Sequence, residues 1–134
     1  MNRAETAVSL KRRNNCCQAV LLAFADILPL SEKELSVIGS GFGSGMGCMK
    51  ATCGALCGAS IAAGLLNDTG RPTSMVTRQI LSKFEQLCGA TICEDLKGVK
   101  TGTPLCSCDN CVKNAVIALE TVLARKSIFK KEKV

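Results

Sequence analysis

Apolar residues recur at helical spacing along most of the chain. In the segments 76–88 and 112–123 they fall every three or four residues, which places them on one face of a helix. No stretch alternates apolar and polar residues for long, and no Asn-Gly pair marks a hairpin turn. The pattern predicts an all-α protein.

Capping residues and helix breakers divide the chain into separate helices. Asn15 can cap a helix that Pro29 stops. Ser31 with Glu34 forms a capping box, and Asp109 is placed to cap the last helix. The predicted helices cover residues 4–12, 16–28, 31–38, 49–66, 73–87 and 109 onward, with a single turn around Cys93. We expect one domain, residues 1–134, folded as a compact bundle of five to six helices.

Two glycine-rich segments lie next to each other in the middle of the chain. Between Gly39 and Gly47 every second residue is glycine, which predicts a loop whose spacing does not match the phosphate-binding motifs. In the following helix, Gly54, Gly58 and Ala62 form one ridge, so we expect this helix to be central and tightly packed. Each helical glycine costs roughly 1 kcal/mol relative to alanine. Close packing or a site must offset that cost, which makes Gly54 and Gly58 candidate cofactor-binding residues.

The ten cysteines are the most informative part of the composition. Residues 1–15 are polar and lack the apolar core of a signal peptide, and the longest apolar stretch, 54–66, is too short to span a bilayer. We therefore expect a cytoplasmic protein without membrane contact, whose thiols are mostly reduced. In that compartment dense cysteine indicates metal binding or thiol chemistry more often than structural disulfides.

Missing residue types exclude several functions. The chain has no histidine, which excludes a Cys–His nucleophilic pair and CxxCH haem attachment, so haem is not expected. A zinc site would have to be all-cysteine or cysteine plus carboxylate. With no tryptophan or tyrosine and four phenylalanines, a nucleic-acid stacking surface is not expected. No acid–base pair can be nominated, which leaves open whether the protein is an enzyme.

The formal net charge of +6 is spread along the chain, with one cluster at its end. This cluster consists of Arg125, Lys126, Lys130, Lys131 and Lys133. We interpret it as a solvated helix end, where cations also suit the helix dipole. The alternative is a docking patch for an acidic partner or nucleic acid.

Cys53 is the strongest single candidate for a functional thiol. It falls near the start of the small-residue helix, where the helix dipole and free N–H groups favour the thiolate and lower its pKa. A thiolate is both the nucleophile and the metal ligand. The alternative interpretation treats Cys53 and Cys57 as small hydrophobic residues in a tight helix interface.

The segment Cys53-Gly-Ala-Leu-Cys-Gly58 resembles the CGAxxG core of the C_GCAxxG_C_C family. Residues 15–21, NCCQAVL, are similar to that family's NCxQxVL helix, and the glycine-rich stretch 41–47 is also typical. Residues 93–98 and a cysteine opening the last helix, Cys111, then follow in the family's order. The resemblance covers nearly the whole chain and implies a helical domain with an inferred redox role.

The resemblance selects four signature cysteines from the ten. They are Cys16, Cys53, Cys93 and Cys111. The remaining six depart from the family pattern: Cys17, Cys48, Cys57, Cys88, Cys106 and Cys108. Because cysteines crowd the run from Cys106 to Cys111, the alignment leaves open which of them is the fourth signature cysteine. The extra cysteines also leave open a second thiol function of this chain.

Three functions remain open at this point. In the first, Cys16, Cys53, Cys93 and Cys111 ligate an iron–sulfur cluster that exchanges electrons with a partner protein. In the second, Cys53 is a reactive thiol, and Cys16 or Cys93 resolves its mixed disulfide. The third is an all-cysteine zinc site or a cysteine-rich interaction domain. A homodimer is compatible with all three, because 47% apolar residues is generous for a chain of this size.

Overall fold

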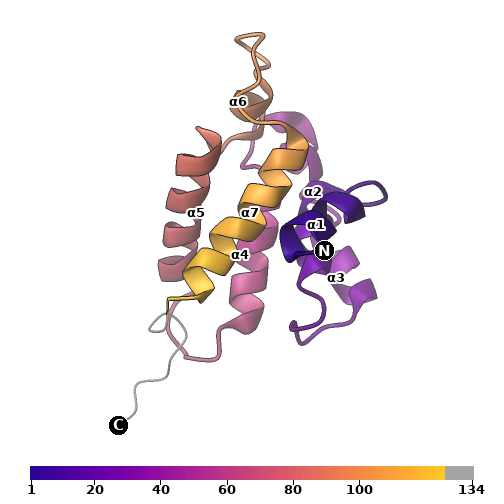
Figure 1. Cartoon of the computed structure of the whole chain (residues 1–134), viewed down its shortest axis with the longest axis vertical. Coiled ribbons are helices and arrows are strands. Elements are labelled where there is room, and N and C mark those ends of the chain that lie inside the picture. Colours follow the sequence, from indigo (N-terminus) through magenta and orange to yellow (C-terminus); the bar gives the residue numbers. More distant parts are fainter. Residues whose placement is uncertain (126–134) are drawn as a thin grey trace.

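The computed structural model describes residues 1–125, and in these residues the prediction of an all-α fold is confirmed (Figure 1). The elements are α1 (Arg3–Leu10), α2 (Cys16–Ala23), α3 (Glu32–Gly39), a π-helical segment η1 (Gly45–Met49), α4 (Gly54–Leu66), α5 (Ser74–Cys88), α6 (Cys93–Lys97) and α7 (Cys108–Leu123). Six of them have eight residues or more, and no strand is present in the described part of the chain. Among these helices, none combines the length and the hydropathy needed to cross a membrane.

The small-residue helix α4 is central, as predicted. It packs against α2, α5 and α7. A Cβ atom added to Gly58 would lie 2.7 Å from the Cys17 carbonyl oxygen, so the two backbones approach more closely than any side chain would allow. Close packing between α2 and α4 therefore offsets the cost of a glycine in this helix.

The longer helices bury the faces that their periodicity predicts. On α5, Val76, Ile80 and Phe84 are buried, and on α7 the positions of Val112 and Val116 are fully buried. The capping box of Ser31 and Glu34 at the start of α3 is also present. These elements form where the sequence places them because their signals are local and periodic.

Helix α2 ends at Ala23, five residues earlier than predicted. The Arg3 guanidinium donates a hydrogen bond to the Ala23 carbonyl at 2.8 Å and lies 4.9 Å from the centre of the Phe24 ring. The carbonyl that would continue the helix is thus bound by a side chain from α1. The chain passes into turns, and Ile27 is 46% exposed.

The starts of α4 and α7 also differ from the prediction. Helix α4 begins at Gly54 with Cys53 as its N-cap, because the backbone before it is not helical: Ser44, Met46 and Met49 have left-handed φ angles. Helix α7 begins at Cys108, and its cap is Ser107, whose hydroxyl accepts a hydrogen bond from the Asn110 N–H at 3.1 Å. Asp109 lies inside the first turn of α7 rather than at its cap.

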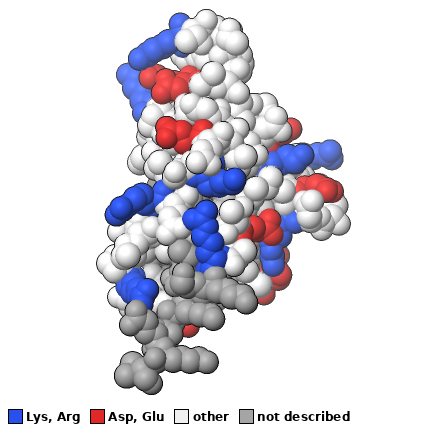
Figure 2. Space-filling model, turned by 60° about the vertical axis from the view of Figure 1, so that its left-hand side comes forward, with Lys and Arg blue, Asp and Glu red and all other residues white. Residues whose placement is uncertain are grey.

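Charged side chains are distributed over the surface. Figure 2 shows Lys and Arg side chains with Asp and Glu side chains between them on the face it presents. Of the basic cluster predicted at the end of the chain, Arg125 is exposed and donates a hydrogen bond to the Gln79 side chain. The other members, Lys126, Lys130, Lys131 and Lys133, lie outside the described residues.

Candidate functional site

A cavity of about 280 Å³ lies at the end of the bundle where α2, α4 and α7 begin. Six of the ten cysteines line it: Cys16, Cys53, Cys93, Cys106, Cys108 and Cys111. All four signature cysteines are among them. Lys97 and Lys11, the latter paired with the Asp109 carboxylate at 3.1 Å, contribute cationic side chains to the same lining, and Leu96 contributes an apolar one. The cavity therefore offers soft sulfur donors and positive charge, with no histidine or carboxylate in its lining.

Helix starts place the signature cysteines. Cys16 is the first residue of α2, and Cys53 is the N-cap of α4. Cys93 opens α6, and Cys111 lies in the first turn of α7. The N–H groups at the first turn of a helix have no intrahelical partner and carry positive partial charge. Four helix starts directed at one cavity therefore place positive partial charge around its sulfur atoms.

A short backbone pairing brings Cys53 and Cys93 together. The Cys53 N–H donates to the Thr91 carbonyl at 2.8 Å, and the Cys93 N–H donates to the Ala51 carbonyl at 3.0 Å. These two bonds form an isolated antiparallel bridge between residues about forty positions apart. The relative placement of the two thiols is consequently fixed by backbone hydrogen bonds.

Two glycines let the backbone pack directly against sulfur-bearing side chains. A Cβ on Gly54 would lie 2.5 Å from the Cys16 sulfur, and one on Gly45 would lie 2.6 Å from the Cys93 Cβ. Gly45 also has a φ of +57°, which glycine adopts most readily. Of the two candidate cofactor-binding glycines, Gly54 lines the cavity, whereas Gly58 packs against α2 outside the residues that line it.

The Cys53 thiol is the signature thiol with the greatest tendency to ionise. A hydrogen bond with the Cys111 thiol and the N–H groups of Leu56 and Ala55 lower the pKa of Cys53 to about 7, despite its burial. Burial raises the pKa of the Cys16 and Cys93 thiols. The helix start thus contributes to the low pKa of Cys53, as the sequence indicates, but the neighbouring Cys111 thiol contributes more.

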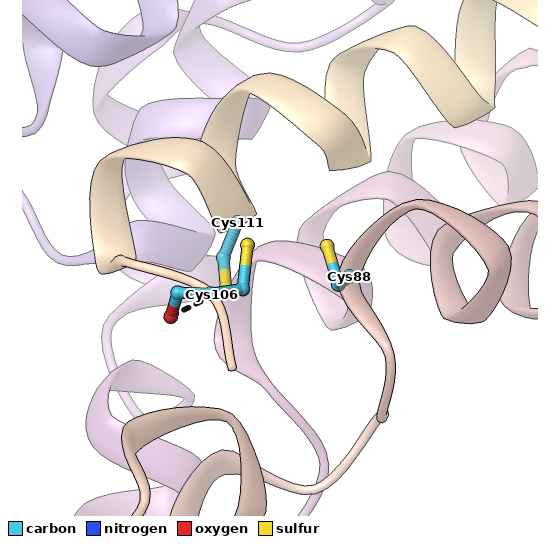
Figure 3. A group of neighbouring side chains, drawn as sticks. All are labelled: Cys88, Cys106 and Cys111. Atoms are coloured by element: carbon cyan, nitrogen blue, oxygen red, sulfur yellow. Dashed lines mark hydrogen bonds between the residues drawn. The ribbon is translucent and has the colours of Figure 1, made fainter. Parts of the chain in front are cut away.

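Next to the cavity, Cys88, Cys106 and Cys111 form a second group of thiols, which we call the α5–α7 thiol cluster. Their three sulfur atoms all lie within 4.8 Å of one another. Figure 3 shows the side chains coming from the end of α5, from the loop before α7 and from the first turn of α7. The Asn114 amide nitrogen is 3.4 Å from the Cys88 sulfur and 3.9 Å from the Cys106 sulfur.

Sequence reasoning did not identify the α5–α7 thiol cluster as a site. The periodicity places Cys88 on the buried stripe of α5, and both Cys88 and Cys106 are among the six cysteines outside the family pattern. The signal that could have pointed to it is the crowded run from Cys106 to Cys111, which brings several thiols to one helix start. The approach of Cys88, which is 18 residues earlier in the chain than Cys106, depends on the packing of α5 against α7.

The remaining cysteines have other surroundings. Cys17 is fully buried between α2 and α4, and burial raises its pKa to about 12. Burial also raises the pKa of Cys57 to about 11. These two thiols remain protonated at neutral pH and pack as small hydrophobic residues. Cys48 is exposed, and its thiol points to the Gly45 carbonyl at 3.6 Å.

The shifted thiol pKa values predict how the stability of the reduced, metal-free chain depends on pH. On folding, the pKa of Cys53 falls from 9.0 to about 7, and a hydrogen bond with the Cys111 thiol lowers the pKa of Cys88 to about 6. The stability that these two thiols contribute is fully present above pH 9 and is lost as the pH falls through their folded pKa values. The raised pKa values of Cys17 and Cys57 act in the opposite sense and reduce stability above pH 9. We expect the free energy of unfolding to rise by about 1–3 kcal/mol between pH 7 and 9, then to fall.

Urea unfolding at a series of pH values, with a phosphine reductant and a chelator present, measures this dependence. Cys53→Ser should reduce the rise between pH 7 and 9, leaving the part that Cys88 contributes, without removing the decline above pH 9. An unchanged rise in Cys53→Ser would mean that another group causes it.

A comparison with protein families agrees with the family resemblance seen in the sequence. A family model described as "Putative redox-active protein (C_GCAxxG_C_C)" matches residues 14–122. No curated protein and no solved structure matches the chain. The matched segment contains every cysteine and every residue of the cavity lining except Lys11. A match over that length makes the chain a member of the C_GCAxxG_C_C family.

Proposed function

We propose that this protein is an electron carrier whose cavity holds an iron–sulfur cluster. The ligands would be the thiolates of Cys16, Cys53, Cys93 and Cys111. The observation that carries the proposal is a cavity of about 280 Å³ with sulfur donors from four separate helix starts around it. The protein would bring these donors together by folding, unlike ferredoxins, in which most ligands come from one short run.

The donor set and the size of the cavity fit such a cluster. Thiolates are soft ligands that suit iron–sulfur clusters, zinc and cuprous ions. A single zinc ion bound at about 2.3 Å would draw its sulfur ligands to within about 4 Å of one another and leave no room between them. A disulfide needs no volume at all between its sulfurs. The cavity is far larger than the ~30 Å³ share of one water molecule, which favours a group of several atoms.

The residues around the cavity have distinct roles in this proposal. When bound, an iron–sulfur cluster supplies one-electron transfer at a potential set by charge, burial and hydrogen bonds to sulfur. Lys11 and Lys97 would offset the negative charge of the thiolates. Cys53 and Cys111 are nearly inaccessible to solvent, and burial of the site would limit attack by water and oxygen. Gly45 and Gly54 would keep the backbone close to the ligands.

The redox partner is proposed to dock over the mouth of this cavity. Cys16, Cys106 and Cys108 are half-buried, so the lining reaches the surface. Lys97 would favour a partner with an acidic surface, because complementary charge steers association, whereas Lys11 is already paired with Asp109. The rate of association should then fall with ionic strength.

A second candidate function is thiol–disulfide exchange by Cys53 and Cys111. The contact between these two thiols and the low pKa of Cys53 favour it. In this reaction the Cys53 thiolate would attack a disulfide of the acceptor, forming a mixed disulfide and releasing one acceptor thiolate. The Cys111 thiol would lose its proton and attack the Cys53 sulfur, which releases the second acceptor sulfur and leaves a Cys53–Cys111 disulfide and a reduced acceptor dithiol. The cavity volume has no role in this scheme, which is why we place it second.

Anaerobic purification followed by visible absorption and by iron and sulfide analysis tests the proposal. We expect a brown protein with stoichiometric iron and sulfide, which Cys16→Ser and Cys93→Ser each abolish. Cys48→Ser is the matched control and should keep the colour, because Cys48 is exposed and outside the cavity lining. A colourless, iron-free protein that gains a Cys53–Cys111 disulfide on oxidation would replace the first proposal with the second.

A further inference from the structure

The α5–α7 thiol cluster is a compact donor set that the proposed iron–sulfur site does not use, apart from Cys111. Cys88 and Cys111 are buried, and Cys106 is half-buried. Cys106 and Cys111 also line the cavity, so one side of the cluster opens into it. Cys88 is absent from the cavity lining and closes the other side of the cluster.

We propose that Cys88, Cys106 and Cys111 form a second metal site, which binds one zinc ion. The proposal goes beyond the proposed electron-carrier function and shares one ligand with it, the Cys111 thiolate, which would bridge the two metals when both are bound. Three sulfur atoms within 4.8 Å of one another need only a small contraction to reach the spacing of about 3.8 Å that tetrahedral zinc requires. Such a contraction is available because Cys106 lies in a loop.

The residues around the cluster support metal binding. The Asn114 amide N–H groups are directed at the Cys88 and Cys106 sulfurs, at 3.4 and 3.9 Å. Donors directed at sulfur orient metal-bound thiolates and stabilise their charge. Asn114 is therefore a positioning residue, held on the second turn of α7 above the ligands that it orients.

Zinc fits the charge and the open side of the cluster. Three thiolates carry three negative charges, and a divalent ion offsets more of that charge in a buried site than a monovalent one does. Zinc also takes a fourth ligand when only three protein ligands are present. The side that opens into the cavity can admit a water molecule for that position. Binding of each zinc ion would release up to three thiol protons to solvent.

Zinc titration of the reduced, chelator-treated full chain under argon tests this site. We expect roughly one zinc ion per chain to remain after desalting, and cobalt as a probe to develop thiolate-to-metal absorption. Cys88→Ser and Cys106→Ser should each lose this zinc. Asn114→Ala should weaken zinc binding by about 10–100-fold while keeping the cobalt spectrum. In the variants that lose zinc, the number of protons released during the titration should fall in proportion to the zinc bound.

Cys16→Ser and Cys93→Ser are the matched controls, because they alter the cavity and leave the cluster intact. They should keep the zinc that Cys88→Ser and Cys106→Ser lose, and circular dichroism must show native helix content in every variant. If Cys88→Ser fails to fold, Cys106→Ser alone decides, since Cys106 lies in a half-buried loop. Zinc retained in Cys106→Ser, or lost in Cys16→Ser, would overturn the proposal. If the anaerobically purified protein contains no iron, and the chelator-treated chain still shows this zinc pattern, only the iron–sulfur proposal is refuted.

Discussion

Gly54→Ala is expected to destabilise the fold by about 1–3 kcal/mol, although alanine is the better helix former. The added Cβ would lie 2.4 Å from the Phe42 carbonyl oxygen and 2.5 Å from the Cys16 sulfur. The carbonyl belongs to the backbone and cannot rotate away, so α4 must shift relative to the loop before it. That shift would displace Cys53, the N-cap of the same helix, and we expect the variant to lose its metal content as well.

Gly64→Ala in the same helix should have the opposite effect. A Cβ at Gly64 would meet only the Thr73 side chain, at 3.8 Å, which is ordinary contact. The alanine should therefore stabilise the chain by up to ~1 kcal/mol through helix propensity. Urea unfolding of the reduced, chelator-treated variants measures both effects, with an unchanged m-value as the check that the unfolded states are comparable. If both substitutions changed the free energy of unfolding by the same amount and in the same direction, helix propensity rather than close packing would determine how α4 tolerates alanine.

The sequence predicts the helices well where the signal is local and periodic. The buried faces of α5 and α7 and the capping box of α3 follow from residues within a few positions of one another. Helix ends were less accurate. The early end of α2 depends on Arg3, which is twenty positions from the Ala23 carbonyl that it binds. At the start of α7, Ser107 and Asp109 are both good caps, and propensity alone could not choose between them.

In the candidate site, too, the local features could be predicted from the sequence and the tertiary ones could not. Residue types and the family resemblance select four cysteines, and each lies at or near a helix start. The cavity between them could not be predicted, because it depends on the pairing of Thr52 with Ile92 and on the left-handed backbone before α4. The α5–α7 thiol cluster requires Cys88 to meet Cys106 across two packed helices. Both arrangements are tertiary and leave no periodic signal in the chain.

Cys111→Ser is expected to have the largest effect on the chemistry of the protein, because Cys111 belongs to both proposed sites. It lines the cavity and is also one of the three sulfurs of the α5–α7 thiol cluster. The variant should lose iron and zinc together, whereas Cys16→Ser loses iron alone and Cys88→Ser loses zinc alone. It should also raise the pKa of Cys53, since the Cys111 thiol is the largest cause of its low value. Alkylation of Cys53 near pH 7, followed by mass spectrometry, should then slow by about tenfold or more.

Cys108→Ser is the matched control for this prediction, and it tests the alignment of the fourth signature cysteine. Cys108 lies in the same first turn of α7 and lines the same cavity, but it is absent from the α5–α7 thiol cluster. If Cys111 is the shared ligand, Cys108→Ser should keep both metals and the low pKa of Cys53. Loss of iron in Cys108→Ser, with iron retained in Cys111→Ser, would instead make Cys108 the fourth ligand of the cluster. The two metal sites would then have no residue in common and could be filled independently.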